Sequence, residues 1–252
     1  MQVIEGTYPK QKALEWDNVG LLVGRQDKDV QKVYVALDIT DEVIEQAVEK
    51  KVDLIVTHHP MLFSPIKQVT DADLVGRRVL KLVQHDICYY AMHTNYDVVG
   101  MADLSSSILE LENTSVLEAT NAEGTEGIGR VGNLKKPLSV LECCELVKEK
   151  FALENVKVYG DLNQMVNCVA ISPGSGKHMS GLAIAKGADV FVTAEIDHHE
   201  GIDSNAEGLA IIDAGHYGLE HIFIEDLVAF LNRNIAEIEV IGANIKHPFQ
   251  VI

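Results

Sequence analysis

Residues 30–97 alternate between short apolar runs and amphipathic segments, and this alternation limits the possible folds most strongly. Strands are predicted at 30–40, 53–59 and 87–97, since each holds a branched or aromatic apolar run that ends in polar residues. Helices are predicted between them, at 41–52 and 73–86, from apolar residues at helical spacing. A β-α-β-α-β order predicts an α/β protein with a mostly parallel, doubly wound sheet.

The same pattern returns in the second half of the chain at an offset of 136 positions. In that register Asp53 aligns with Asp189 and Thr57 with Thr193. After a small gap, "AMHTNYD" aligns with "AGHYGLE", which pairs a histidine and the carboxylate four residues later in both halves. The repeat predicts two related α/β lobes with a site between them at the strand ends.

The expected division places an N-terminal lobe at 1–112 and a C-terminal lobe at 113–252, interleaved into one compact unit. Residues 113–165 form a linking subdomain or the opening of the second lobe. This segment starts rich in glycine, then predicts a helix capped by Ser139 and a strand in "NVKVYG".

Composition narrows the classes of partner. The 21 Lys and Arg residues against 38 Asp and Glu residues give a formal charge of −17, which repels a phosphate backbone and disfavours a nucleic-acid partner. No apolar stretch approaches the roughly 20 residues of a membrane helix, and the N-terminus lacks a signal-peptide pattern, so a cytoplasmic protein is expected. The four cysteines have no Cys-x-x-Cys spacing, which predicts reduced thiols without a disulfide scaffold.

Histidines gather where the predicted strands end, often beside carboxylates. Imidazole and carboxylate ligands suit zinc, iron, manganese and nickel. Open α/β sheets bind ligands at the carboxyl ends of their strands. The pattern therefore predicts a metal site. The four clusters are His58 with His59, His93 with Asp97, His198 with His199, and His216 with Glu220.

Each cluster also has an interpretation without metal. An isolated His-His pair before a proline can simply end a strand, and "HTNYD" can be a turn in which Asn95 and Asp97 accept backbone N–H groups. "EIDHHE" can be a solvated helix start. The metal interpretation gains from the combination, because three strand ends deliver ligands to one edge of the fold.

The stretch "ISPGSGKHMSG" predicts a strand, a glycine turn and a helix start. Such a turn either binds an anion through its backbone amides, with Lys177 taking part, or is a tight structural turn.

Five ordered motifs resemble those of the Nif-three-like family, whose members are often named GTP cyclohydrolase I type 2 homologues. The motifs are "LEWDNVGLLVG", "DLIVTHHPMLF", "MHTNYD", "DVFVTAEIDHH" and "DAGHYGLE", and the resemblance covers essentially the whole chain. Two departures are a shortened N-terminal helix before "EWDNVG" and the absence of the central domain of longer relatives.

The resemblance implies a centre of two divalent metal ions per subunit (Zn, Fe, Mn or Ni) and a toroidal homohexamer with sites facing an internal cavity. The implied metal ligands are His58, His59, Asp97, His216 and Glu220. Either Glu220 or Asp97 is the expected bridge between the ions, because a carboxylate has two oxygens to share.

Two further histidines, His93 and His199, match motif positions that are not main ligands. They become candidates for proton transfer, although each could equally be a structural histidine bonded to a carbonyl. Trp16 is expected in the core, whereas Asp17 and Asn18 hold a turn or line the cavity.

Two functional classes follow. The first is a metal-dependent hydrolase that opens the imidazole ring of a purine nucleotide and releases formate. The second is a binding protein without turnover, which carries metal or senses a metabolite. A purely structural role explains the fold but not the converging ligands.

Overall fold

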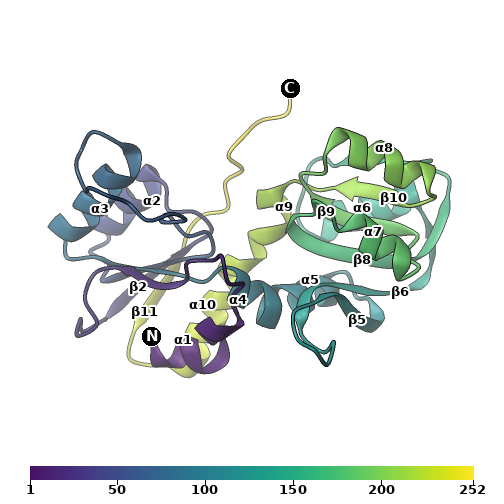
Figure 1. Cartoon of the computed structure of the whole chain (residues 1–252). Coiled ribbons are helices and arrows are strands. Elements are labelled where there is room, and N and C mark those ends of the chain that lie inside the picture. Colours follow the sequence, from purple (N-terminus) through teal and green to yellow (C-terminus); the bar gives the residue numbers. More distant parts are fainter. The chain divides into compact units, whose positions relative to one another are not determined.

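A computed structural model describes all 252 residues and divides the chain into two units (Figure 1). The first unit contains Met1–Tyr96 and Phe223–Lys246, and the second contains Asp97–Ile222 and His247–Ile252. The expected boundary lay at residue 112, but residues 223–246 belong to the first unit and residues 97–112 to the second. Helix α5 (Ala102–Ile108) in that segment packs against β6 (Gly127–Ser139) of the second unit, and Asp103 there accepts a 2.6 Å hydrogen bond from Arg130.

The first unit is built on a five-stranded sheet in the order β1-β4-β3-β2-β11. All neighbouring pairs are parallel except β1 with β4, as the sequence predicted for this half. The strands are β1 (Gly20–Val23), β2 (Lys32–Ala36), β3 (Leu54–Thr57), β4 (Cys88–Ala91) and β11 (Glu239–Gly242). The helices are α1 (Gln2–Thr7), a 3-10 turn (Lys10–Lys12), α2 (Asp41–Glu49), α3 (Leu74–Gln84), α4 (Thr94–Tyr96) and α10 (Ile222–Asn234).

Helices α2 and α3 begin at side chains that cap them. The Thr40 hydroxyl accepts the N–H of Val43 at 3.2 Å, and the Asp73 carboxylate accepts that of Gly76 at 2.8 Å. Such caps satisfy donors that the first helical turn leaves unpaired. These residues therefore fix where each helix starts after its loop.

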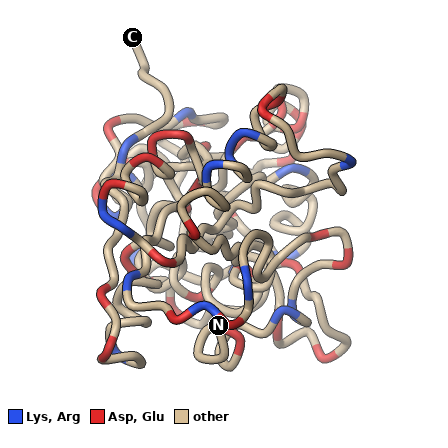
Figure 2. Tube along the Cα trace, turned by 90° about the vertical axis from the view of Figure 1, so that its left-hand side faces the viewer, with Lys and Arg blue, Asp and Glu red and all other residues tan.

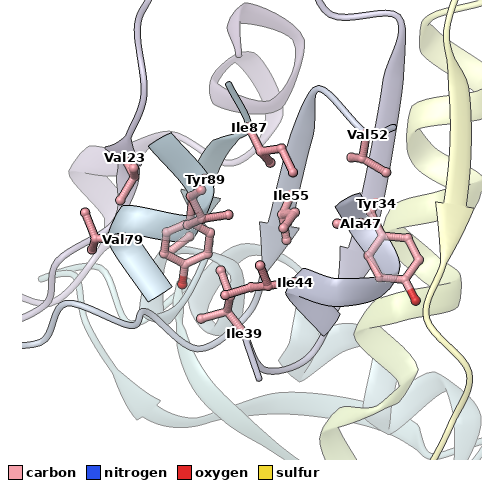
Figure 3. Packing of buried hydrophobic residues seen from close by; sticks show 12 residues of the cluster. Val23, Tyr34, Ile39, Ile44, Ala47, Val52, Ile55, Val79, Ile87 and Tyr89 are labelled. Atoms are coloured by element: carbon pink, nitrogen blue, oxygen red, sulfur yellow. The ribbon is translucent and has the colours of Figure 1, made fainter. Parts of the chain in front are cut away.

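The core of the first unit lies between the sheet and these helices. Figure 3 shows Ile55 and Tyr89 from the strands against Ile44 of α2 and Val79 of α3. Ile44, Ile55 and Tyr89 are fully buried, and each such side chain contributes roughly 1.5–3 kcal/mol when it leaves water. This packing holds the strand ends in register.

The second unit has a six-stranded sheet in the order β5-β6-β8-β9-β10-β7. Only β8 with β9 and β9 with β10 are parallel, so this sheet is mixed rather than mostly parallel. The reason is that the glycine-rich segment forms an antiparallel hairpin of β5 and β6. The strands besides β6 are β5 (Glu112–Ala119), β7 (Lys157–Tyr159), β8 (Met165–Ser175), β9 (Val190–Ala194) and β10 (Ala210–Asp213).

The helices of the second unit include the one predicted after Ser139. Ser139 caps it through a capping box with Glu142, as expected. The strand predicted in "NVKVYG" is β7. The helices besides α5 are α6 (Val140–Lys150), α7 (Ser180–Ala185), α8 (His198–Ala206) and α9 (His216–Glu220), and a π-helical segment covers Asp97–Met101.

The internal repeat exists at the level of hydrogen bonds. The Asp53 carboxylate accepts two successive backbone N–H groups where β2 begins, and Asp189 does the same where β8 passes it. The donors are Gln31 and Lys32 for Asp53, and Asn167 and Cys168 for Asp189. Both donor pairs and both acceptors differ by 136 positions, which is the offset predicted from the sequence.

The register of the last repeated strand corrects one predicted pairing. Met92 donates its N–H to the carbonyl of Thr57, and Ala214 donates to that of Thr193, both at 2.8 Å. Met92 therefore corresponds to Ala214, at an offset of 122. The predicted equivalence of His93 and His216 is displaced by one residue from this strand register.

Figure 2 shows acidic positions along the whole trace, interspersed with fewer basic ones, in keeping with the charge of −17. None of the helices has the length and apolar character that crossing a membrane requires.

Candidate metal centre

His58 follows β3 directly and is fully buried. Its Nδ1 lies 2.8 Å from the carbonyl oxygen of Met92. A carbonyl only accepts hydrogen bonds, so Nδ1 must carry a proton, and in the neutral imidazole the lone pair then lies on Nε2. This tautomer is the one in which Nε2 can bind a metal.

His59 has the same tautomer through a different acceptor. Its Nδ1 lies 2.8 Å from Oδ1 of Asp38, just beyond the end of β2. Because an ionised carboxylate only accepts hydrogen bonds, Nδ1 is again the protonated nitrogen. A carboxylate behind an imidazole also raises the basicity of the metal-binding nitrogen.

His93 lies two residues after β4 and is held by Asp17, whose Oδ1 is 2.9 Å from His93 Nδ1. Thr94 donates to the other Asp17 oxygen from both its backbone N–H and its hydroxyl. Burial alone would raise the pKa of Asp17, but the hydrogen bonds from His93 and Thr94 outweigh it and lower the pKa to about 2. Asp17 is therefore a carboxylate at every physiological pH.

These three histidines form one cluster. One ligand atom from each of His58, His59 and His93 lies within 4.8 Å of the other two. All three protonate Nδ1 against an acceptor, so each offers Nε2 as a ligand. Two or three neutral imidazole nitrogens at this spacing suit a first-row divalent ion.

A buried tyrosine fixes the loop that carries His59. The Tyr89 hydroxyl donates to the carbonyl of His59 at 2.9 Å and accepts the N–H of Met61 at 2.9 Å. Thr57 also donates to the His59 carbonyl, at 2.8 Å. Burial raises the pKa of Tyr89 to about 12, so its hydroxyl keeps its proton. The ligand loop is therefore fastened at its backbone as well as at its rings.

In the second unit, His216 and Glu220 stand one turn apart on α9. His216 Nε2 lies 3.0 Å from Glu220 Oε2, and His216 Nδ1 lies 3.0 Å from Glu195 Oε2. Glu220 is buried, with an exposed fraction of only 3%. An imidazole nitrogen and a carboxylate oxygen at this distance can ligate the same cation.

Gly174 makes room for that carboxylate. A Cβ at this position would lie 2.5 Å from Glu220 Oε1, and the residue has φ +78°, which favours glycine. Gly174 belongs to the "ISPGSGKHMSG" stretch, so this glycine turn supports a candidate ligand.

The alternative of an anion site in that turn is not favoured. The donors beyond the glycines bind the protein's own Glu200, which accepts from the His178 N–H at 3.0 Å and from the Ser180 hydroxyl at 2.6 Å. Lys177 lies 3.4 Å from a carboxylate oxygen of Asp197. The stretch acts as a structural turn.

Two predicted site residues remain. In the second unit, a carboxylate oxygen of Asp97 lies within 4.8 Å of a carboxylate oxygen of Glu220. Asp97 is half-buried and opens the π-helical segment. His199 is exposed in the first turn of α8, where the neighbouring His198 ring lies 5.2 Å away. The roles assigned to both residues stay predictions.

Comparison with known proteins establishes the family. The family model described as Duf34/NIF3 (NGG1p interacting factor 3) matches residues 1–248. The chain belongs to this family. The resemblance predicted from five motifs is therefore confirmed.

Relatives of this NIF3-family protein match over nearly their whole length. A Clostridium perfringens protein named GTP cyclohydrolase 1 type 2 homolog is 35% identical, with 100% of this chain and 98% of the relative covered. A Streptococcus pneumoniae protein of the same name is 38% identical, with coverage of 92% and 89%.

Solved structures agree with the fold. A hypothetical protein from Staphylococcus aureus has a TM-score of 0.89 at 30% identity, with 100% of this chain and 97% of that chain covered. Reduced HcgD from Methanocaldococcus jannaschii has a TM-score of 0.82 at 32% identity, with coverage of 96% and 94%. A Bacillus cereus protein related to NIF3 has a TM-score of 0.94 at 24% identity, with 100% and 97% covered, and supports the fold alone.

Sequence reasoning missed the carboxylates that orient the histidines of this NIF3-family protein. Asp38 and Glu195 each lie just after a strand, and this position in the sequence could have indicated them. Asp17 directly follows Trp16 in the first motif. The expectation that Trp16 lies in the core was wrong, because 61% of this residue is exposed.

Proposed function

We propose that this protein is a metal-dependent hydrolase of the GTP cyclohydrolase 1 type 2 kind, with two divalent ions per subunit. The observation that carries the proposal is the common tautomer of the clustered histidines, which places a ligand lone pair on each Nε2. The proposed ligands are His58, His59, Asp97, His216 and Glu220.

The residues fit such ions by their donor chemistry. Neutral imidazoles backed by acceptors and a buried carboxylate with a glycine beside it are the parts of a first-row metal site. Bound ions of this type would lower the pKa of a coordinated water so that it can act as a nucleophile near neutral pH. We assign bridging to Glu220 or Asp97, because each offers two oxygens.

Proton transfer falls to His93 and, as a second candidate, His199. Asp17 holds a proton on Nδ1 of His93, so His93 can accept or return a proton only at Nε2. His199 is exposed and has no such carboxylate behind it in the second unit, so its orientation is less constrained.

The proposed substrate is a purine nucleotide, from the printed names of the relatives, and the reaction opens its imidazole ring with release of formate. A cytoplasmic homohexameric ring, implied by the family resemblance, completes the proposal.

The test is formate release from GTP by protein reconstituted in turn with zinc, manganese, iron and nickel. Multiple turnovers are expected with at least one metal. Glu220→Ala should abolish turnover and should bind less metal per chain than the wild type. Glu207→Ala is the matched control, since Glu207 is an exposed glutamate of the same unit and should change neither.

No formate with any metal, from protein shown to hold two ions per chain, would refute the hydrolase. A metal carrier or metabolite sensor would then replace it. Unchanged metal binding in Glu220→Ala would refute the ligand assignment.

A further inference from the structure

Two large aromatic side chains are left exposed beside the histidine cluster of the first unit. Trp16 is 61% exposed and Phe63 is 52% exposed. Trp16 is the only tryptophan of the chain. Single exposed apolar residues are common and need no explanation. Two exposed aromatic rings at one candidate site require one.

Both rings contact the same imidazole. The centroid of the Trp16 ring lies 5.8 Å from that of His93 at an interplanar angle of 75°, and the Phe63 centroid lies 5.7 Å away at 88°. His93 is also 5.3 Å from His58 and 5.7 Å from His59 by ring centroids. The two aromatic residues therefore border the cluster rather than an unrelated surface.

The backbone around both rings is fixed. Trp16 adjoins Asp17, whose carboxylate binds both His93 and Thr94. Asn18 donates its side-chain amide to the carbonyl of Leu62, which directly precedes Phe63. This bond ties the two segments together, so the aromatic rings are positioned before any ligand arrives.

We propose that Trp16 and Phe63 form a stacking platform that receives the planar heteroaromatic ring of a nucleobase beside the histidine cluster. The inference deepens the proposed function and rests on it for the class of ligand. Aromatic rings bind bases through their π-faces, and exposed rings keep such faces open to solvent. In the metal-free protein, nearby Asp17 and Asp38 supply negative charge, which favours an uncharged ring over a bare phosphate at this position.

A protein partner is the competing occupant, because Ile66 and Val69 are also exposed in the loop after Phe63. The nucleobase is favoured because the two aromatic rings meet at His93, whereas no ring or hydrogen-bond contact joins Ile66 or Val69 to the cluster. Ile66→Ala thus provides a matched control from the same loop.

Binding can be measured without turnover, because the sole tryptophan reports on the platform. Full-length protein, treated with chelator to prevent chemistry, is titrated with guanosine, GTP and inorganic tripolyphosphate while tryptophan fluorescence is followed. Guanosine and GTP should change the emission saturably, and tripolyphosphate should not. Equal changes with tripolyphosphate, or none with guanosine up to millimolar concentration, would overturn the proposal.

Calorimetry of the variants separates stacking from other causes. Trp16→Ala and Phe63→Ala should each weaken guanosine binding by about 5- to 150-fold, the range measured for loss of one base stack. Trp16→Phe should recover most of the affinity, because it keeps an aromatic face. Ile66→Ala should bind like wild type.

Two outcomes would count against the platform. Equal weakening by Ile66→Ala, or a changed oligomeric mass in Trp16→Ala with unchanged guanosine affinity, would assign the surface to a protein contact. Failure of formate release alone would refute the hydrolase and leave these binding results intact.

Discussion

Replacing Gly174 by alanine should displace the Glu220 carboxylate. The new Cβ would lie 2.5 Å from Glu220 Oε1, and ordinary contact begins at 3.4 Å, so the oxygen must withdraw by about 0.9 Å. Metal sites tolerate deviations of only about 0.2 Å in ligand distance. The atom that must move is the end of a side chain, so the clash is relieved by moving the ligand rather than the backbone. We expect metal affinity to fall by about tenfold or more.

Gly187→Ala is the matched control for backbone strain. Gly187 has φ +75°, close to the +78° of Gly174, but a Cβ there meets nothing within 4 Å. Both variants should lose about 1–2 kcal/mol of unfolding free energy, the cost of a left-handed alanine. Denaturant unfolding of metal-free protein and calorimetric metal titration measure the two effects separately. Equal metal affinity in both variants would refute the reasoning.

Three more predictions concern the supports of the site. Asp17→Asn should make the unfolding free energy depend less on pH between 2 and 5. The pKa of Asp17 is lowered from 3.8 to about 2, which contributes about 2 kcal/mol of stability. This contribution is complete above pH 3.8 and is lost as the pH falls toward 2, which urea unfolding across pH 2–5 can follow. Tyr89→Phe should cost about 1–3 kcal/mol in urea unfolding, because the Met61 N–H loses its acceptor and the His59 carbonyl keeps only the Thr57 hydroxyl as a donor. Asp53→Ala and Asp189→Ala should destabilise their own units by similar amounts, about 1–3 kcal/mol. Limited proteolysis with cleavage sites mapped to each unit measures the two losses, and clearly unequal losses would contradict the equivalence.

The fold was largely predictable, because the repeated pattern depends on local chemistry. Apolar runs such as Leu54–Thr57 are long enough for a buried strand, and capping residues such as Ser139 mark helix starts in the sequence. The mixed second sheet was not predicted, because hairpin pairing of β5 and β6 depends on a turn whose geometry the glycines permit without specifying.

The histidines of the candidate site were predictable because strand ends place them together, but their supports were not. Asp17 is 76 residues from His93 in sequence, and no local pattern connects the two. Trp16 was expected in the core because tryptophan is usually buried, yet hydropathy alone does not show which apolar residue a site leaves exposed.

The first unit is discontinuous in sequence, and this has a consequence for its synthesis. Strand β11 completes the sheet edge beside β2 some two hundred residues after β2 has been made. A ribosome therefore releases all of the main segment of the second unit, Asp97–Ile222, before the first unit has its last strand. Until then, the unpaired edge of β2 exposes backbone groups that can pair with another nascent chain. If the first unit folds only after β11 has been made, its sheet forms without this open edge.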